Sequence, residues 1–265
     1  MPPVRFLDDV RLEVGGTTLH FGYPIPEGID GLVIMKQADM IEPYERLCDR
    51  LSPRRIVELG INRGGSTALL AELARPERLV AFDLSTAPLP ALDDFIAAGG
   101  LADVVRPHFG VDQADRSRLA EILDDEFGAE MLDLVVDDAS HLYAPTLASF
   151  EVLFPRLRPG GVFVIEDWRS EHWLFDRIAQ QLQDPDEAQI EALTEVLEAG
   201  PPAEAYRSLP RLVHELVMVR TSAPDVIASI EIDRYWVVVT RGPVDLPAGF
   251  RLADHYYDHF GMLAD

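Results

Sequence analysis

The chain has 265 residues, and its 46 acidic and 23 basic side chains give a formal net charge of −23. Nucleic acids are bound through basic surfaces, and anionic membranes attract polybasic segments, so this charge balance argues against both kinds of partner. A hydrophobic content of 48% with 26% charged residues is ordinary for a folded domain with a full core. Extensive disorder is therefore not expected.

The cysteine count and the start of the chain bear on its compartment. The single cysteine, Cys48, cannot form an intrachain disulfide or a cysteine metal cage, which indicates a reducing compartment. The first ten residues carry acids where a secretory signal needs a basic and then an apolar region. No apolar stretch approaches the roughly 20 residues that span a bilayer. We therefore expect a soluble, cytoplasmic protein.

The hydrophobic periods along the chain predict its elements. Short alternating runs broken by Gly15-Gly16 and by prolines predict a hairpin and an extended segment over residues 1–35. From Asp39 a helical period runs to Ser52, and strands then alternate with helices, which is typical of a parallel sheet with crossover helices. The predicted strands are 55–59, 78–83, 102–107, 132–136 and 162–165. The helices between them are 66–73, 93–98, 119–127 and 143–157, and a turn is predicted at Pro159-Gly160-Gly161.

The last part of the chain has a looser pattern. Helices are predicted at 172–183, 188–199 and 209–220, and two strands at 226–233 and 235–240 that form an antiparallel pair at one edge. The fold class is therefore α/β: a Rossmann-like, doubly wound, mostly parallel seven-stranded sheet with an antiparallel edge strand and helices on both faces. We expect one main domain over residues 36–265, with a helical insertion at about 168–207.

A glycine-rich loop lies between the first parallel strand and its helix, in the segment from Glu58 to Thr67 with the sequence ELGINRGGST. Glycines there allow close approach to a ligand, and the helix start offers N–H groups to an anion. Asp83 ends the next strand, where an acid can accept both ribose hydroxyls of a nucleoside cofactor. The competing interpretation is that the glycines serve packing and Asp83 caps a turn. The sole lysine, Lys36, lies upstream of the loop, so the Tyr-x-x-x-Lys pair of short-chain dehydrogenases is absent.

Two later strands end in paired acids, Asp137-Asp138 and Glu166-Asp167. The carboxyl ends of neighbouring parallel strands face one crevice, so we expect these carboxylates to converge there. Clustered carboxylates repel unless a cation is shared, and an oxygen set suits Mg²⁺, Mn²⁺ or Ca²⁺. His141, three residues after Asp138, is suited to take a proton from a hydroxyl. The alternative is that Asp138 and Ser140 cap the next helix, Glu166 and Asp167 are solvated and His141 packs.

With these residues, the chain resembles the class I S-adenosylmethionine-dependent methyltransferases. More narrowly, it is similar to the metal-dependent sugar O-methyltransferases of macrolide and related antibiotic pathways and to the cephalosporin hydroxylase group. The residues that carry the resemblance are Glu58-x-Gly60-x-x-x-Gly64-Gly65-Ser66, Asp83, Asp137-Asp138-x-Ser140-His141 and Glu166-Asp167. It covers roughly residues 32–242.

The resemblance implies a role for each matching residue. It makes Asp138, Glu166 and Asp167 the Mg²⁺ ligands and His141 the base. Gly60 and Ser66 would line the methionine end of S-adenosylmethionine, with Asp83 at the ribose and Asp112 near the adenine. The full set assigned to this cofactor is Glu58, Gly60, Asn62, Arg63, Gly64, Ser66, Asp83, Asp112 and Asp137. Family members often form dimers or tetramers, so a homo-oligomer is expected.

The motifs leave several functions open. A small-molecule hydroxyl, such as a sugar of a glycosylated natural product or a nucleotide sugar, is the expected acceptor. Alternatives are a role of the cephalosporin hydroxylase kind, a catechol-type methyltransferase, and a protein that binds the cofactor without catalysis. Acceptor specificity is expected in residues 1–40 and 168–205. Two interpretations stay open for Trp168, His172, Trp173 and Phe175: an aromatic wall for the acceptor, or packing of their helix, which is favoured for Phe175. Lys36 lies in the segment 31–40, which in the resembled family approaches the cofactor pocket, but a position on the solvated surface is favoured over a role at the site.

Overall fold

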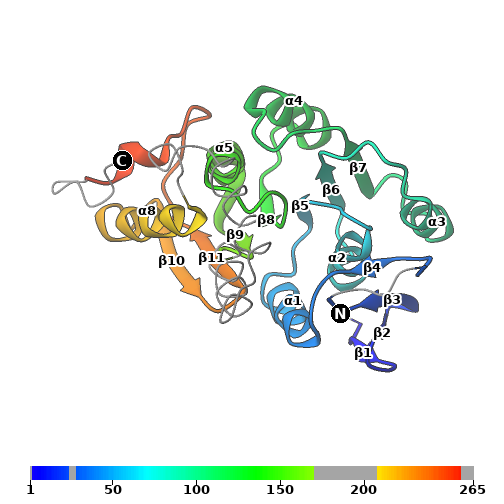
Figure 1. Cartoon of the computed structure of the whole chain (residues 1–265). Helices are drawn as coiled ribbons and strands as arrows, with labels where there is room; N and C mark the ends of the chain where they lie inside the picture. Colours follow the sequence, from blue (N-terminus) through cyan, green and yellow to red (C-terminus); the bar gives the residue numbers. More distant parts are fainter. Residues whose placement is uncertain (1, 24–27, 170–207, 258–265) are drawn as a thin grey trace, which may run out of the picture.

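The computed structural model describes residues 2–23, 28–169 and 208–257. Its main sheet has seven strands in the order β10-β11-β9-β8-β5-β6-β7 (Figure 1). The strands are β5 (Arg55–Leu59), β6 (Arg78–Asp83), β7 (Val105–Phe109), β8 (Leu132–Asp137), β9 (Leu157–Glu166), β10 (Ile227–Ile232) and β11 (Trp236–Arg241). The five strands from β7 to β9 are parallel, whereas β11 is antiparallel to both of its neighbours. The predicted fold class is confirmed. The strand that is antiparallel to its neighbours, β11, lies one place inside the edge, and β10 forms the edge itself.

The helices cover both faces of this sheet (Figure 1). They are α1 (Ala38–Leu51), α2 (Gly65–Ala74), α3 (Pro90–Ala98), α4 (Arg116–Phe127), α5 (Tyr143–Leu153) and α8 (Leu209–Ser222). Successive strand residues point to opposite faces, so Ile56 packs with Leu69 of α2 whereas Val57 packs in the core that holds Phe150 of α5. Every residue of β8 is buried, as expected for a strand covered on both sides.

A separate four-stranded sheet precedes this domain. Its strands, in the order β1-β2-β3-β4, are β1 (Arg5–Phe6), β2 (Arg11–Val14), β3 (Thr17–Phe21) and β4 (Val33–Ile34). The predicted hairpin is confirmed as β2 and β3, joined at Gly15-Gly16. An isolated bridge joins Val33 of β4 to Gly64, which precedes α2, so the sheet lies against the glycine loop.

Some boundaries differ from the prediction. Strand β7 begins at Val105, after the predicted start, and the predicted turn at Pro159-Gly160-Gly161 lies within β9. Helix α5 ends at Leu153 and a 3₁₀ turn, η1 (Phe154–Arg156), follows it because Pro155 cannot continue an α-helix. A second 3₁₀ turn is η2 (Leu252–His255). The helices predicted at 172–183 and 188–199 lie outside the described residues.

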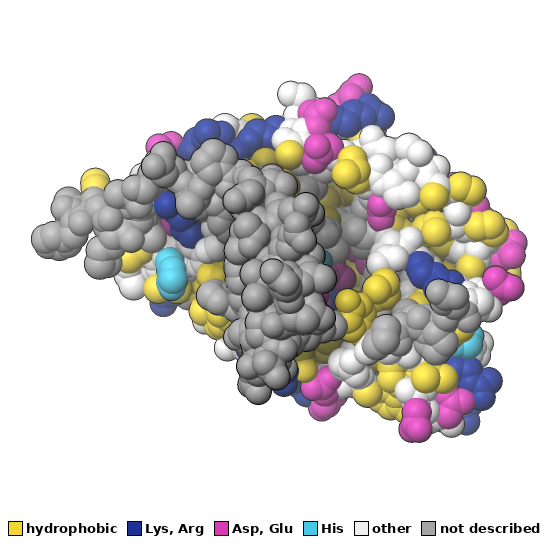
Figure 2. Space-filling model, in the orientation of Figure 1, with side chains coloured by type: hydrophobic (Ala, Val, Ile, Leu, Met, Phe, Trp, Pro, Cys, Tyr) yellow, Lys and Arg dark blue, Asp and Glu magenta, His cyan; other side chains and the backbone are white. Residues whose placement is uncertain are grey.

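Charged side chains of both signs lie on the described surface (Figure 2). Figure 2 shows acidic and basic side chains interspersed with hydrophobic ones over the visible face. Among the described residues, none of the helices combines the length and the apolar character that crossing a membrane demands.

Candidate functional site

The largest cavity that lies against the predicted site has a volume of about 1150 Å³ and opens at the carboxyl ends of β5, β6, β8 and β9. Eight of the residues predicted for the site line it: Gly60, Asn62, Ser66, Asp83, Asp112, Asp138, His141 and Asp167. Five do not, namely Glu58, Arg63, Gly64, Asp137 and Glu166. The structure therefore separates the predicted residues into those that face the cavity and those that lie outside its lining.

The glycine loop forms one wall of this cavity. Its path is set by backbone hydrogen bonds, since the N–H of Gly60 donates to the carbonyl of Phe82 at 2.8 Å. The carboxylate of Asp83 accepts from the N–H groups of Ile61 at 2.9 Å and Asn62 at 2.8 Å. Its second oxygen accepts from the N–H of Ser85 at 2.7 Å. Asp83 thus ties the loop to the end of β6, and it also lines the cavity.

Gly60 is required by its backbone and by its surroundings. Its φ is +95°, and a Cβ there would lie 2.2 Å from the carbonyl oxygen of Asp138. Gly60→Ala is expected to destabilise the fold by about 2–4 kcal/mol, from backbone strain and overpacking together. The matched control is Gly16→Ala, because Gly16 has a φ of +97° with nothing within 4 Å of its Cβ position. Urea unfolding of both variants measures the difference, and equal losses would contradict a clash at Gly60.

Glu58 lies outside the cavity lining and is 1% exposed. Its carboxylate accepts a hydrogen bond of 2.5 Å from the hydroxyl of Thr67, in the first turn of α2. Burial raises the pKa of Glu58 to about 7, although hydrogen bonds from Ser66 and Thr67 oppose the rise. Glu58 therefore joins β5 to α2 through the interior.

A carboxyl with a raised pKa keeps its proton in the folded state at a pH where the unfolded chain has lost it. Glu58 therefore lowers the stability of the wild type as the pH rises from 4.5 to about 7. The effect at higher pH is on the order of 3 kcal/mol. Glu58→Gln retains an acceptor for Thr67 and removes the ionisation, so its advantage over the wild type should grow across this window. Urea unfolding at several pH values measures it, and parallel curves would contradict the burial argument.

Three further side chains converge on the cavity from two loops. One ligand atom from each of Asp138, His141 and Asp167 lies within 4.8 Å of the others, and all three residues are half-buried. His141 Nε2 is 3.9 Å from Asp138 Oδ1. The carboxylate oxygens of Asp138 and Asp167 suit a hard divalent cation, and the imidazole of His141 lies beside them. The residues present therefore fit a bound metal ion.

Backbone strain is concentrated around this group. The described residues include five non-glycine residues with positive φ. Ser52 and Arg75 end helices, where this conformation is common. The other three, Asn62, His141 and Asp167, all line the cavity. Such conformations cost about 1–3 kcal/mol each and cluster at functional sites, so the strain favours this cavity as the candidate site.

Glu166 has a different environment from the other acids. It is 2% exposed, and its Oε2 lies 2.6 Å from the Nζ of Lys36. The hydroxyl of Tyr44 donates to its other oxygen. Burial raises the pKa of Glu166, and the Lys36 ammonium opposes that rise. Glu166 is therefore engaged by two side chains and is not among the three residues grouped around the cavity.

The expectation that Lys36 lies on the solvated surface is wrong. Its side chain is 4% exposed, and its Nζ also contacts Asp138 Oδ2 at 2.6 Å. Burial by itself lowers the pKa of Lys36, but the charges of Asp138 and Glu166 outweigh it and raise the pKa well above its usual value. The sequence analysis favoured a surface position for Lys36 over a role at the site, and it did not select Tyr44 as a site residue. The one signal was that a chain rich in arginine keeps a single lysine.

Asp137 supports the site from the interior. Its carboxylate accepts hydrogen bonds from Gln113 Nε2 at 3.0 Å and from the hydroxyl of Ser149 at 2.9 Å. Burial raises its pKa to about 6. The capping interpretation of Asp138 is not supported, because α5 begins at Tyr143 and the residue before it, Leu142, makes no side-chain cap.

The predicted aromatic wall is only partly described. Trp168 packs against the core, and its indole N–H donates to the carbonyl of Asp233 at 3.0 Å. It is not part of the cavity lining. His172, Trp173 and Phe175 lie outside the described residues. The apolar lining comes instead from side chains that the sequence analysis did not select: Tyr23, Met35, Met40, Leu142 and Tyr235.

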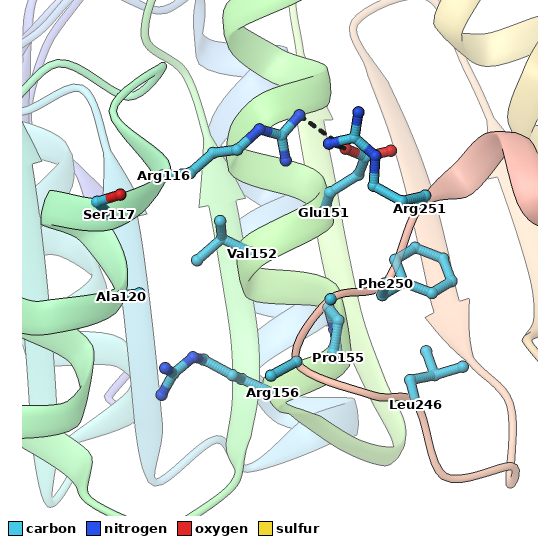
Figure 3. Close-up of a pocket in the computed structure, with 12 residues that line it drawn as sticks. Arg116, Ser117, Ala120, Glu151, Val152, Pro155, Arg156, Leu246, Phe250 and Arg251 are labelled. Atoms are coloured by element: carbon cyan, nitrogen blue, oxygen red, sulfur yellow. Dashed lines mark ion pairs between the residues drawn. The ribbon is translucent and has the colours of Figure 1, made fainter.

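A second cavity, of about 450 Å³, lies between α4, α5 and the segment before η2. Figure 3 shows Arg116 and Arg251 directed at Glu151. Their ion pairs with Glu151 measure 2.7 Å and 3.2 Å, so the acid is shared by two cations. None of the predicted site residues lines this cavity.

The known proteins and the family that this chain resembles in sequence are methyltransferases. Residues 57–168 match a family described as a methyltransferase domain. An 8-demethyl-8-alpha-L-rhamnosyl tetracenomycin-C 2'-O-methyltransferase of Streptomyces olivaceus is 35% identical, over 31% of this chain and 27% of that protein. A mycinamicin VI 2''-O-methyltransferase of Micromonospora griseorubida is 39% identical, over 24% of this chain and 20% of that protein. The matched regions thus cover less than a third of either relative.

Solved structures show the same fold. The MycE methyltransferase from the mycinamycin pathway, in complex with Mg, S-adenosylhomocysteine (SAH) and mycinamycin VI, has a TM-score of 0.53 and 21% identity, covering 76% of this chain and 49% of that chain. The O-methyltransferase TomG of Streptomyces achromogenes, from tomaymycin synthesis, has a TM-score of 0.52 and 18% identity, covering 78% and 82%. At these identities the likeness concerns the fold alone.

The matched family region holds the glycine loop, Asp83 and both acidic strand ends, and the sheet around it has the fold of these neighbours. The fold and the family match therefore agree. Residues 57–168 therefore match a methyltransferase domain, and the sheet that they help to form is similar in fold to these S-adenosylmethionine-dependent O-methyltransferases.

Proposed function

We propose that this chain is a metal-dependent O-methyltransferase that uses S-adenosylmethionine to methylate a hydroxyl of a small molecule. The observation that carries the proposal is the convergence of Asp138, His141 and Asp167, within 4.8 Å of one another, on a cavity that the glycine loop and Asp83 also line. A cofactor site and a group able to handle a hydroxyl proton thus share one space. We propose Asp138 and Asp167 as the residues that hold a cation such as Mg²⁺, while Glu166 lies behind them and is paired with Lys36.

The residues of the chain divide the chemistry between them. When bound, S-adenosylmethionine supplies an electrophilic methyl group, and a divalent cation supplies positive charge that stabilises a deprotonating hydroxyl. His141 Nε2 accepts the proton of that hydroxyl, because it lies beside the carboxylates that orient the acceptor. Asp83 and the loop at Gly60 orient the cofactor, and alignment of the two reactants supplies much of the rate.

The acceptor that we propose is a sugar of a glycosylated natural product or a nucleotide sugar. The relatives in the comparison are named for methylation of a rhamnosyl 2'-hydroxyl and of the mycinamicin VI 2''-hydroxyl. The cavity is large, and Tyr23, Met40 and Tyr235 give it apolar and aromatic surface beside the acids. Such a lining suits the ring faces of a sugar and an attached apolar group.

Calorimetry with SAH and Mg²⁺, followed by mass spectrometry of acceptors incubated with S-adenosylmethionine, tests the proposal. We expect SAH binding and a mass gain of one methyl group on a sugar-bearing acceptor. The panel should hold glycosylated macrolides, nucleotide sugars and a catechol. Preferential methylation of the catechol would indicate a catechol-type enzyme, and SAH binding without transfer to any acceptor would favour a binding protein.

A further inference from the structure

Lys36 is held at the cavity by the segment that precedes α1. Val33 of β4 pairs with His20 and also forms a bridge to Gly64. A Cβ on Gly65 would lie 2.3 Å from the carbonyl of Val33, so only glycine permits this close approach. Asn62 donates to the sulfur of Met35 at 3.0 Å, one residue before Lys36. The backbone at Lys36 is therefore fastened to the glycine loop.

The ammonium group of Lys36 lies between two acids and an aromatic ring. Its Nζ is 2.6 Å from Asp138 Oδ2 and 2.6 Å from Glu166 Oε2. It also lies 5.7 Å from the centre of the Tyr44 ring, while the Tyr44 hydroxyl donates to Glu166. The side chain is 4% exposed, so this charge is neutralised by neighbouring groups with little help from water.

Asp138 connects this ion pair to the cavity. Its Oδ2 contacts Lys36, whereas its Oδ1 is the oxygen near His141 Nε2. A divalent cation held by Asp138 and Asp167 would therefore share a carboxylate with an ammonium group. The Lys36 ammonium and the divalent cation would repel each other at this carboxylate. Each would therefore weaken the interaction of the other with Asp138.

We propose that Lys36 is a built-in counter-charge for Asp138 and Glu166, which holds the acids together without a metal and lowers the affinity of the site for a divalent cation. This inference rests on the cation site of the proposed function. Lys36 acts through Asp138 and is a positioning residue. The net charge of Lys36, Asp138, Glu166 and Asp167 is −2, and it becomes −3 when Lys36 is made neutral.

The test uses Lys36→Met in the full chain, with two readouts that do not depend on activity. Without metal, the melting temperature should fall, because two buried acids lose their counter-charge. Calorimetry should show that the variant binds Mn²⁺ about tenfold more tightly than the wild type, or more. A change of this size is typical of the coupling between two charged groups that share a site. Added Mn²⁺ should also raise the melting temperature of the variant more than that of the wild type.

Arg158→Met is the matched control. Arg158 pairs with Asp133 Oδ1 at 2.6 Å, at the beginning of β8 and away from the cavity. Its loss should lower the melting temperature without changing Mn²⁺ affinity. A folded Lys36→Met variant with unchanged or weaker Mn²⁺ affinity would overturn the inference.

A second variant keeps the test decisive if Lys36→Met does not fold. Lys36→Met combined with Glu166→Gln removes both charges, returns the net charge of the cluster to −2 and leaves an acceptor for Tyr44. It should bind Mn²⁺ at least as tightly as the wild type, and weaker binding would overturn the inference.

The outcomes separate this inference from the proposed function. If the wild type binds Mn²⁺ and Lys36→Met does not bind it more tightly, only the role of Lys36 fails. If neither protein binds Mn²⁺, the cation site of the proposed function fails as well.

Discussion

Replacing His141 with alanine is expected to lower kcat by about 10²–10⁴-fold, the usual contribution of a positioned general base. The imidazole lies within 4.8 Å of both acids at the cavity, where a substrate hydroxyl must lose its proton. SAH affinity should change little, because the glycine loop and Asp83 form a different wall. Single-turnover methyl transfer measures the first quantity, and calorimetry with SAH measures the second.

His214→Ala is the matched control, because His214 is exposed on α8 and does not line the cavity. Its turnover should equal that of the wild type. Normal turnover in His141→Ala would remove His141 as the base. Loss of SAH binding in that variant would instead assign His141 to the cofactor.

Asp138→Asn and Asp167→Asn are each expected to abolish the response of activity to added Mg²⁺ and to lower kcat/KM by about 10²–10³-fold, as expected for loss of a preorganised electrostatic contact. Asparagine keeps the size of the side chain and tolerates the positive φ of 47° at Asp167. Activity titrated with Mg²⁺ after chelator treatment measures the effect.

Asp112→Asn provides the contrast within the same cavity. Asp112 lines the cavity but is not part of the group formed by Asp138, His141 and Asp167. This variant should keep its response to Mg²⁺ even if the KM for S-adenosylmethionine rises. Full activity of chelator-treated wild type would exclude the metal from the reaction.

Much of the fold followed from local patterns. The strands β5 and β6 have the predicted bounds, because buried parallel strands are short apolar runs with sharp polar ends. The pairing of β8 with β9 also followed, since one helix connects them. The start of β7 was misplaced because that edge strand is only partly buried and its pattern is weak.

The two acid pairs show how far residue type alone can locate a site. In each pair the first acid ends a strand and is buried, as Asp137 and Glu166 are, whereas the second follows the strand and lines the cavity. The sequence placed both pairs at the sheet edge. It did not show which acid of each pair is buried and which lines the cavity, because this depends on the residue at which each strand leaves the sheet.

By itself, the sequence determined the α/β class, the glycine loop with Asp83, and acids at the carboxyl ends of two neighbouring strands. These features depend on residues close together in the chain and on the topology of parallel strands. Only the tertiary structure decided that Lys36 contacts Asp138 and Glu166, which lie 102 and 130 residues further along the chain. No local period encodes that contact. It arises because β4 packs on the glycine loop and the segment after β4 places the Lys36 side chain among the acids, where burial requires the charges to be paired.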